Sequence, residues 1–376
     1  MSAKPSQFTQ SALTQQADRQ AKWLALWQSR GLLMRALYPL SWLFENIVRV
    51  RRAAFLHHWR AQYRMPIPVV VVGGIMVGGV GKTPIVARLV QDLREAGFHP
   101  VIVSRGYGGA NAAEHRMEAT RVTETSLASE VGDEPLQLAM NTGVPVWVGQ
   151  DRVSVVRAVC VAHPECDVIV SDDGLQHYRL YRDIELVVID ERGVGNGWCL
   201  PAGPLREPPA RLNSVFALIQ HSRGTAQNVR TFAWLPQPLH TPQFALNSTL
   251  NDAYSLVEPK LHRPLTAFIG QKVLRCAGIA RPQVFFDMLA GEGIVGETLP
   301  LPDHSPFDVD LAQSLMAMDF DVLLLTEKDA VKCLPWLNLY PELAQKIWVV
   351  PLTVTPGADW DELSRQIVTR LRTIEH

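Results

Sequence analysis

Lys82 and Thr83 close a glycine-rich segment, Gly78-Gly79-Val80-Gly81-Lys82-Thr83, whose residue types suit phosphate binding. Glycines let backbone N–H groups curl around phosphate oxygens, the lysine reaches the terminal phosphates, and the threonine hydroxyl can ligate Mg²⁺. The strict pattern GxxxxGK[ST] is not met, because Met76 stands at its first glycine. We interpret the segment as a phosphate-binding loop; the alternative is a glycine turn with a structural role only.

Two adjacent carboxylates, Asp172 and Asp173, follow the β-type run at residues 167–170. Acidic residues that end a hydrophobic strand in a phosphate-loop protein are positioned to hold Mg²⁺, directly or through water. One of the two is expected to ligate the ion and the other to position or tune it. The competing interpretation is a solvated turn.

Two further residues suit proton transfer but have simpler explanations. Asp133 lies in a Gly-Asp-Glu-Pro turn at the start of a predicted helix at 135–140, where acids commonly serve as caps. His304 lies in the turn Pro-Asp-His-Ser-Pro, where a lone histidine is more often a surface residue. The local sequence favours the simpler explanation at both positions.

The elements that must position these residues alternate between strand-like and helical patterns. The phosphate-binding loop follows a β-branched run at 68–72 and precedes a helical pattern at 85–93. Further β-type runs occur at residues 100–103, 145–148, 167–170, 184–189 and 215–219. This alternation predicts an α/β fold with a doubly wound parallel sheet, in which ligands lie at the carboxyl ends of strands. Polar clusters stand at three such ends, at residues 104–108, 171–177 and 190–191.

A second, smaller α/β domain is predicted after a Pro- and Gln-rich stretch that begins beyond residue 225. Its strands are expected at 266–269, 321–325 and 347–350, and its helices near 283–289, 311–316 and 360–371. The predicted domains are therefore N-terminal helices at 1–60, a phosphate-loop domain at 61–225 and a C-terminal domain at 226–376. Lys328 and Asp329 are expected to form an interdomain ion pair or, alternatively, to contact the nucleotide.

The first part of the chain is basic and aromatic. The 376 residues carry a net charge of −1, but residues 19–64 alone carry +8, and four of the ten tryptophans lie among these arginines. Apolar residues recur there at helical spacing on both sides of Pro39, which predicts two amphipathic helices. They could lie at an anionic membrane surface or dock on their own domain. The near-balanced total argues against a nucleic-acid binder, and five scattered cysteines favour a reducing compartment.

Eight motifs in order resemble the tetraacyldisaccharide 4'-kinases, the lipid A 4'-kinases of Gram-negative bacteria. They run from about residue 68 to 332 and are GGVGKTP, SRGYGG, VGDEP, SDDGLQH, GNGWCLPAGPLREP, AGIARPQVFFDML, LPDHSPF and LLLTEKDAVK. The resemblance implies transfer of the γ-phosphate of ATP to the 4'-hydroxyl of tetraacyldisaccharide 1-phosphate, with ATP and Mg²⁺ as cofactors. It also implies peripheral attachment to the anionic cytoplasmic face of the inner membrane, with no obligate protein partner. The alternative is a GTPase or metallochaperone-like nucleotide switch, but no NKxD element is found.

The resemblance also assigns roles. It implies nucleotide binding by Gly78 to Thr83 and magnesium binding by Thr83, Asp172 and Asp173. It implies that Asp133 and His304 form a dyad that activates the sugar hydroxyl, near Arg206, which would require the second domain to close over the first. Candidate substrate contacts are Ser104, Arg105, Tyr107, Gln176 and His177. The sequence departs from the family pattern at Gly74, Met76 and Ser305.

Overall fold

The computed structural model describes residues 19, 22–106, 119–224, 238–355 and 357–374. Its larger lobe is built on a nine-stranded sheet that is parallel through its centre and has an antiparallel strand at each edge. The strand order is β15 (Leu352–Val354), β8 (Gln243–Leu250), β7 (Ala217–Arg223), β6 (Ile184–Ile189), β1 (Val69–Gly73), β5 (Val168–Asp172), β2 (Pro100–Ser104), β4 (Val146–Val148) and β3 (Thr120–Val122). The expected α/β fold with a parallel sheet is confirmed.

The centre of this sheet is a strand that is buried along its whole length. All five residues of β1 are buried, and β1 pairs in parallel with β5 on one side and β6 on the other. A strand covered on both faces needs a continuous β-branched run rather than an alternating pattern, which explains the four consecutive valines. The carboxyl ends of β1 and β5 therefore lie side by side at one edge of the sheet.

The larger lobe also contains several helices. The helices among its described residues include α3 (Lys82–Glu95), α4 (Ala128–Val131), α5 (Asp133–Thr142), α6 (Arg152–Ala162) and α12 (Ala358–Arg372), with a 3₁₀ turn at Pro209–Ser214. Helix α3 presents Ile85, Leu89 and Leu93 to the sheet, all fully buried. The helical spacing of its apolar residues thus places the start of α3, where the phosphate-binding loop ends, at the carboxyl end of β1.

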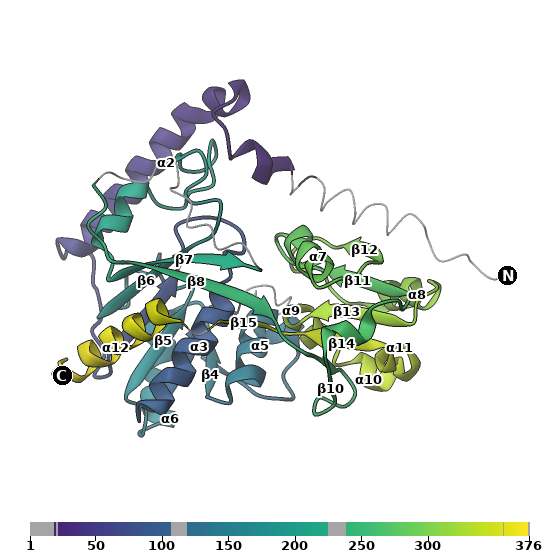
Figure 1. Cartoon of the computed structure of the whole chain (residues 1–376). Helices are drawn as coiled ribbons and strands as arrows, with labels where there is room; N and C mark the ends of the chain where they lie inside the picture. Colours follow the sequence, from purple (N-terminus) through teal and green to yellow (C-terminus); the bar gives the residue numbers. More distant parts are fainter. Residues whose placement is uncertain (1–18, 20–21, 107–118, 225–237, 356, 375–376) are drawn as a thin grey trace.

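The smaller lobe is a second α/β unit, as predicted (Figure 1). Its six-stranded sheet has the order β10 (His262–Arg263), β9 (Ala253–Ser255), β14 (Ile347–Val350), β13 (Val322–Thr326), β11 (Val273–Ala277) and β12 (Glu297–Pro300). Helices accompany it at α7 (Pro282–Gly291), α8 (Val309–Met316), α9 (Glu327–Ala330), α10 (Trp336–Leu339) and α11 (Pro341–Gln345), and 3₁₀ turns lie at Leu265–Phe268 and Val331–Cys333. The strand expected at 266–269 is wrong: this run forms the first 3₁₀ turn, and β11 takes the place in the sheet.

The chain passes between the two lobes twice. It leaves the larger sheet after β8 and returns as β15, which pairs antiparallel with β8, with Leu352 opposite Leu250. Helix α12 then packs against the larger lobe, where Trp360 and Ile367 belong to its core (Figure 1). Residues 226–376 are therefore shared between the two lobes rather than forming one separate unit.

The N-terminal region contains one long helix, α2 (Leu32–Leu56), after a short helical segment at residues 22–26. The expected break at Pro39 is wrong, because Pro39 lies inside α2 and the break falls at residues 27–31. The buried Ser41, two residues on, donates to the carbonyl of Cys199 at 2.7 Å and accepts from the N–H of Ala202 at 2.8 Å. Tertiary contacts of this kind offset the hydrogen bond that a proline removes from a helix. Among the described residues, no helix has the length and apolarity needed to cross a bilayer.

Candidate active site

The phosphate-binding loop joins β1 to α3, and Lys82 and Thr83 form the first turn of that helix. Gly78 and Gly81 have φ angles of 90° and 79°, which glycine adopts without strain. A Cβ at Gly81 would collide with the ring of His221, which supports the loop from below through a hydrogen bond to the carbonyl of Val80 at 3.0 Å. Burial lowers the pKa of His221 to about 4, so this imidazole is neutral.

Asp173 holds two cations beside each other at the mouth of the loop. The Nζ atom of Lys82 is 3.1 Å from its Oδ1, and Nη1 of Arg206 is 3.0 Å from its Oδ2. Burial opposes ionisation of Asp173, but these two cations keep its pKa well below the usual range. The structure thus brings together three residues predicted from separate motifs, in an arrangement able to neutralise charge on a transferred phosphoryl group.

Asp172 has a different environment although it is the adjacent residue. It is 1% exposed at the end of β5, and its Oδ2 accepts a hydrogen bond from Ser104 Oγ at 3.3 Å. Its Oδ1 has no hydrogen-bond partner among the described residues. Burial raises the pKa of Asp172, and the neighbouring carboxylates of Glu134 and Asp173 add to the effect. A buried carboxylate oxygen without a donor suits a hard cation.

Asp133 and His304 meet across the boundary between the lobes. Asp133 begins α5 in the larger lobe, His304 lies in the loop between β12 and α8 of the smaller lobe, and Nδ1 of His304 is 3.0 Å from Oδ2 of Asp133. Burial disfavours the charged form of Asp133, but the hydrogen bond with His304 and the charge of Lys328 lower its pKa to about 2. The hydrogen bond with Asp133 in turn raises the pKa of His304. The pair has the geometry of a base oriented by a carboxylate.

These groups line a single cleft of about 610 Å³ between the two lobes. One wall carries the phosphate-binding loop and the acidic pair, and another carries the His304 loop. Arg51 of α2 also lines the cleft, and its Nη2 is 3.4 Å from the carbonyl of Gln176. The N-terminal helix therefore contributes a side chain to the same space as Lys82 and His304.

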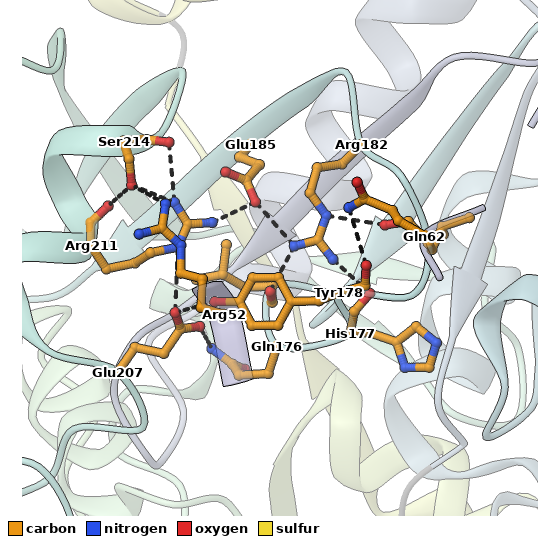
Figure 2. Close-up of polar contacts among 12 residues, drawn as sticks. Arg52, Gln62, Gln176, His177, Tyr178, Arg182, Glu185, Glu207, Arg211 and Ser214 are labelled. Atoms are coloured by element: carbon orange, nitrogen blue, oxygen red, sulfur yellow. Dashed lines mark hydrogen bonds and ion pairs between the residues drawn. The ribbon is translucent and has the colours of Figure 1, made fainter. Parts of the chain in front are cut away.

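A buried ionic network lies beneath the cleft and ties together the loops that carry Asp173 and Arg206 (Figure 2). Glu207 is 1% exposed and accepts hydrogen bonds from Gln176 Nε2, at 2.8 Å, and from the Tyr178 hydroxyl. Arg211 lies between Glu207 and Glu185, at 3.4 Å and 2.5 Å. These contacts join the segment that follows Asp173 to the segment that carries Arg206, and so help to fix the backbone on which both residues lie.

The candidate substrate contacts divide into three groups. Arg105 and His177 line the cleft, and burial together with the charge of Arg152 lowers the pKa of His177 to about 4. Ser104 and Gln176 line the same cleft and bond to the protein as well, since Ser104 donates to Asp172 and the amide of Gln176 donates to Glu207 and to the carbonyl of Gly74. Tyr107 lies outside the described residues.

Two of the departures from the family pattern have a structural explanation. Met76 is 1% exposed and forms a β-bridge with Leu205, so its side chain belongs to the core beneath the loop. Ser305 is buried, and its carbonyl accepts a hydrogen bond from Lys332 Nζ at 3.1 Å. These side chains therefore do not occupy the phosphate-binding face of the cleft.

Sequence reasoning missed three residues that support the site. Arg152 is 2% exposed and donates through Nη2 to the carbonyl of Asp172 at 3.2 Å, and His221 and Glu207 act beneath the loops as described above. Each is a buried charged or polar residue, but only Glu207 stands inside a motif, PLREP. A position at the start of α6, directly after β4, was the only signal for Arg152.

Three comparisons with known proteins agree with one another. The family model for tetraacyldisaccharide-1-phosphate 4'-kinase matches residues 33–372. The tetraacyldisaccharide 4'-kinase of Herminiimonas arsenicoxydans is 44% identical over 347 residues, which cover 92% of this chain and 94% of that protein. The one from Aromatoleum aromaticum is 46% identical over 312 residues, covering 82% and 88%. The crystal structure of LpxK from Aquifex aeolicus in complex with ATP superposes with a TM-score of 0.73 at 24% identity, covering 90% of this chain and all of that one, which supports the fold.

Proposed function

The chain belongs to the tetraacyldisaccharide 4'-kinase family, and from that membership we propose which residues carry out the phosphoryl transfer. The protein is a kinase that phosphorylates the 4'-hydroxyl of an acylated disaccharide 1-phosphate in lipid A biosynthesis. Our proposal assigns the base to His304, oriented by Asp133, and the neutralisation of phosphoryl charge to Lys82 and Arg206. The alternative of a GTPase-like switch is not favoured, because the relatives named above are kinases.

The observation that carries this proposal is that the His304–Asp133 pair and the Lys82–Asp173–Arg206 cluster line one cleft. A sugar hydroxyl is a weak nucleophile and needs a base to accept its proton as the phosphoryl group moves. With Nδ1 of His304 directed at Asp133, its Nε2 is the atom that accepts this proton. The proton then rests on an imidazolium that the carboxylate of Asp133 stabilises.

ATP is the proposed phosphoryl donor. A second cavity, of about 160 Å³, lies against the phosphate-binding loop and is lined by Gly79 to Pro84 and by apolar side chains of both lobes, Leu250, Ile279, Val284, Phe285, Met288 and Leu352. Charged residues complete its wall, among them Glu134, Arg223, Arg281 and Lys328. A flat purine ring suits an apolar pocket that borders a phosphate-binding backbone. The purine ring of ATP would then lie on one side of the phosphate-binding loop and the acceptor cleft on the other, with the terminal phosphate directed toward Lys82.

Mg²⁺ is the proposed metal cofactor, and the residues present suit it. The orphaned Oδ1 of Asp172 and the hydroxyl of Thr83 are hard oxygen donors near the phosphate-binding loop. Asp173 already pairs with two cations, so Asp172 is the better candidate for a direct ligand and Asp173 for the positioning acid. When bound, the ion would neutralise charge on the phosphate oxygens.

Helix α2 is proposed to attach the enzyme to an anionic membrane surface, on the cytoplasmic face of the inner membrane where its lipid substrate resides. More than half of the large exposed apolar side chains among the described residues lie between residues 23 and 59, including Trp42, Leu43 and Ile47. The charge of +8 belongs to residues 19–64, which include this region. Exposed aromatic and aliphatic side chains interleaved with arginines suit the interface of an anionic bilayer. Arg51, which lines the cleft, would receive the substrate from that side.

Phosphate transfer from labelled ATP to the acylated disaccharide in mixed micelles tests the proposed roles. His304→Ala is expected to lower kcat by about 10²-fold or more, the typical contribution of a general base, and to leave ATP affinity within about twofold. Lys272→Met, on an exposed pair with Asp319, is the control and should behave as the wild type. A His304→Ala enzyme with the wild-type rate would remove His304 from the mechanism.

A further inference from the structure

The segment from Thr326 to Lys332, the TEKDAVK motif, has no role in the transfer as described so far. It is anchored by Asp329, which is fully buried and accepts hydrogen bonds from the N–H of Gly278, at 2.9 Å, and from Thr326 Oγ1, at 2.7 Å. Asp329 also pairs with Lys332 at 2.6 Å. The motif is therefore a fixed support in the smaller lobe, from which Lys328 extends toward the larger lobe.

Lys328 joins the two lobes beside the Asp133–His304 pair. Its Nζ is 3.0 Å from Oδ1 of Asp303 in the smaller lobe, and 2.9 Å from Oε1 of Glu134 and 4.0 Å from Oδ2 of Asp133 in α5 of the larger lobe. The side chain is only 14% exposed. An interdomain ion pair was one of the two expectations for Lys328 and Asp329; Lys328 forms one with Glu134, whereas Asp329 pairs with Lys332 within the smaller lobe. An ammonium held by carboxylates of both lobes keeps the lobes at a fixed separation at this point.

His304 has a backbone conformation that must be imposed from outside. Its φ angle is 60°, in the left-handed region that a histidine seldom adopts. The TEKDAVK motif holds the residue on each side of it, because Lys328 binds the carboxylate of Asp303 and Lys332 donates to the carbonyl of Ser305 at 3.1 Å. The motif thus fixes the direction of the imidazole as well as the distance between the lobes.

The charges around His304 show what Lys328 does electrostatically. Asp133 and Asp303 both face the imidazole, so two carboxylates lie at one histidine, and Glu134 pairs with Lys328 beside them. The hydrogen bond with Asp133 raises the pKa of His304, whereas burial and the charge of Lys328 lower it. Lys332 is the other described cation that acts on Asp133. Without Lys328 the carboxylates would raise the pKa of His304 further and favour the imidazolium, which cannot accept another proton.

We propose that Lys328 is a positioning residue for the phosphoryl transfer, which aligns His304 with Asp133 across the lobes and offsets the surrounding carboxylates so that His304 can act as a base. This inference rests on the proposed role of the Asp133–His304 pair. It gives the TEKDAVK motif a function in acceptor activation, although Lys328 also lines the cavity proposed for ATP.

The test is the pH dependence of kcat with saturating ATP and acylated disaccharide. Lys328→Met removes the charge and keeps the length of the side chain. The acidic limb of its kcat–pH profile should move up by about one to two pH units. Its kcat should be about tenfold lower at pH 7 and partly recovered at higher pH. Asp303→Asn removes one carboxylate and should move the limb in the opposite direction. Lys328→Arg should stay close to the wild type, and Lys272→Met is the surface control.

Each outcome decides between explanations. An acidic limb that stays in place in Lys328→Met while the melting temperature falls would make Lys328 a structural bridge only and overturn the proposal. A raised KM for ATP with an unmoved limb would make it a nucleotide contact and would also overturn it. If Lys328→Met fails to fold, Asp303→Asn still tests the proposal, because its acidic limb in the kcat–pH profile should move to lower pH. Failure of the dyad itself is separately visible, since His304→Ala would then retain its rate.

Discussion

The Nδ1 atom of His304 lies 3.0 Å from Oδ2 of Asp133, and 171 residues separate the two along the chain. An imidazole in one lobe is therefore oriented by a carboxylate in the other. The contact between the lobes thus also assembles the proposed base, which gives a physical reason for placing it across the cleft from the glycine-rich loop.

Replacing Asp133 with Asn should change both the rate and its pH dependence. The base acts only when neutral, so the wild-type rate should rise as pH passes through the pKa of His304, which the hydrogen bond with Asp133 raises above its ordinary value. Asp133→Asn should lower kcat by about 10²-fold, because the imidazole loses its orientation, and move the acidic limb to lower pH. A kcat–pH profile measures both, and a limb that moves up would contradict the proposed pair.

Gly81 should tolerate a side chain much less well than Gly97. Both have left-handed φ angles, 79° and 92°, but a Cβ at Gly97 meets nothing within 4 Å, whereas one at Gly81 collides with His221. Gly97→Ala should cost about 1 kcal/mol in the free energy of unfolding, the backbone term alone. Gly81→Ala should cost more and should also weaken ATP binding. Denaturant unfolding and ATP titration of the two variants make the comparison, and equal effects would show that His221 does not support the loop.

Ser41 and Trp42 are adjacent in α2 but face different surroundings. Ser41 is 1% exposed and bonds the loop that follows β6, whereas Trp42 is 59% exposed. Ser41→Ala leaves the buried N–H of Ala202 without a partner, whereas the carbonyl of Cys199 keeps the N–H of Gly203. The variant should lower the free energy of unfolding by about 2 kcal/mol.

Trp42→Ser, by contrast, should leave unfolding within about 0.5 kcal/mol and weaken sedimentation with anionic phospholipid vesicles severalfold. Vesicles of neutral lipid are the control for the charge of this region. Unchanged binding by a Trp42→Ser and Leu43→Ser double variant would exclude this face as the attachment surface.

Asp172 and Asp173 should differ in their response to magnesium. Asp172→Asn should raise the Mg²⁺ concentration for half-maximal rate by at least about tenfold, since it removes a direct donor. Asp173→Asn releases Lys82 and Arg206, so its main effect should be on kcat at saturating Mg²⁺. Initial rates across a Mg²⁺ titration separate the two, and the reverse pattern would exchange their roles.

The sequence predicts the centre of the larger sheet well and the contacts between distant segments poorly. The strand β1 could be predicted from its valines, because a strand that is buried on both faces needs an unbroken apolar run. The helix break predicted at Pro39 is wrong because helix propensity does not include tertiary contacts, such as those that Ser41 makes. The apolar residues at 266–269 misled because a short apolar run indicates burial without distinguishing a strand from a 3₁₀ turn. An interdomain ion pair of Lys328 was one of two expectations, but its partners Glu134 and Asp303 depend on tertiary placement, which no local pattern contains.

The pairing of β8 with β15 has a consequence for synthesis of the chain. The partner of β8 is about a hundred residues further on, and the whole smaller lobe lies between them. While those residues are translated, at about 5–20 residues per second, the β8 edge stays unpaired for about 5–20 s. An open parallel edge is where unwanted strand pairing begins. β15 therefore covers the β8 edge only late in synthesis, and α12 follows it. A ribosome that stops before residue 352 leaves a larger lobe that is prone to aggregation.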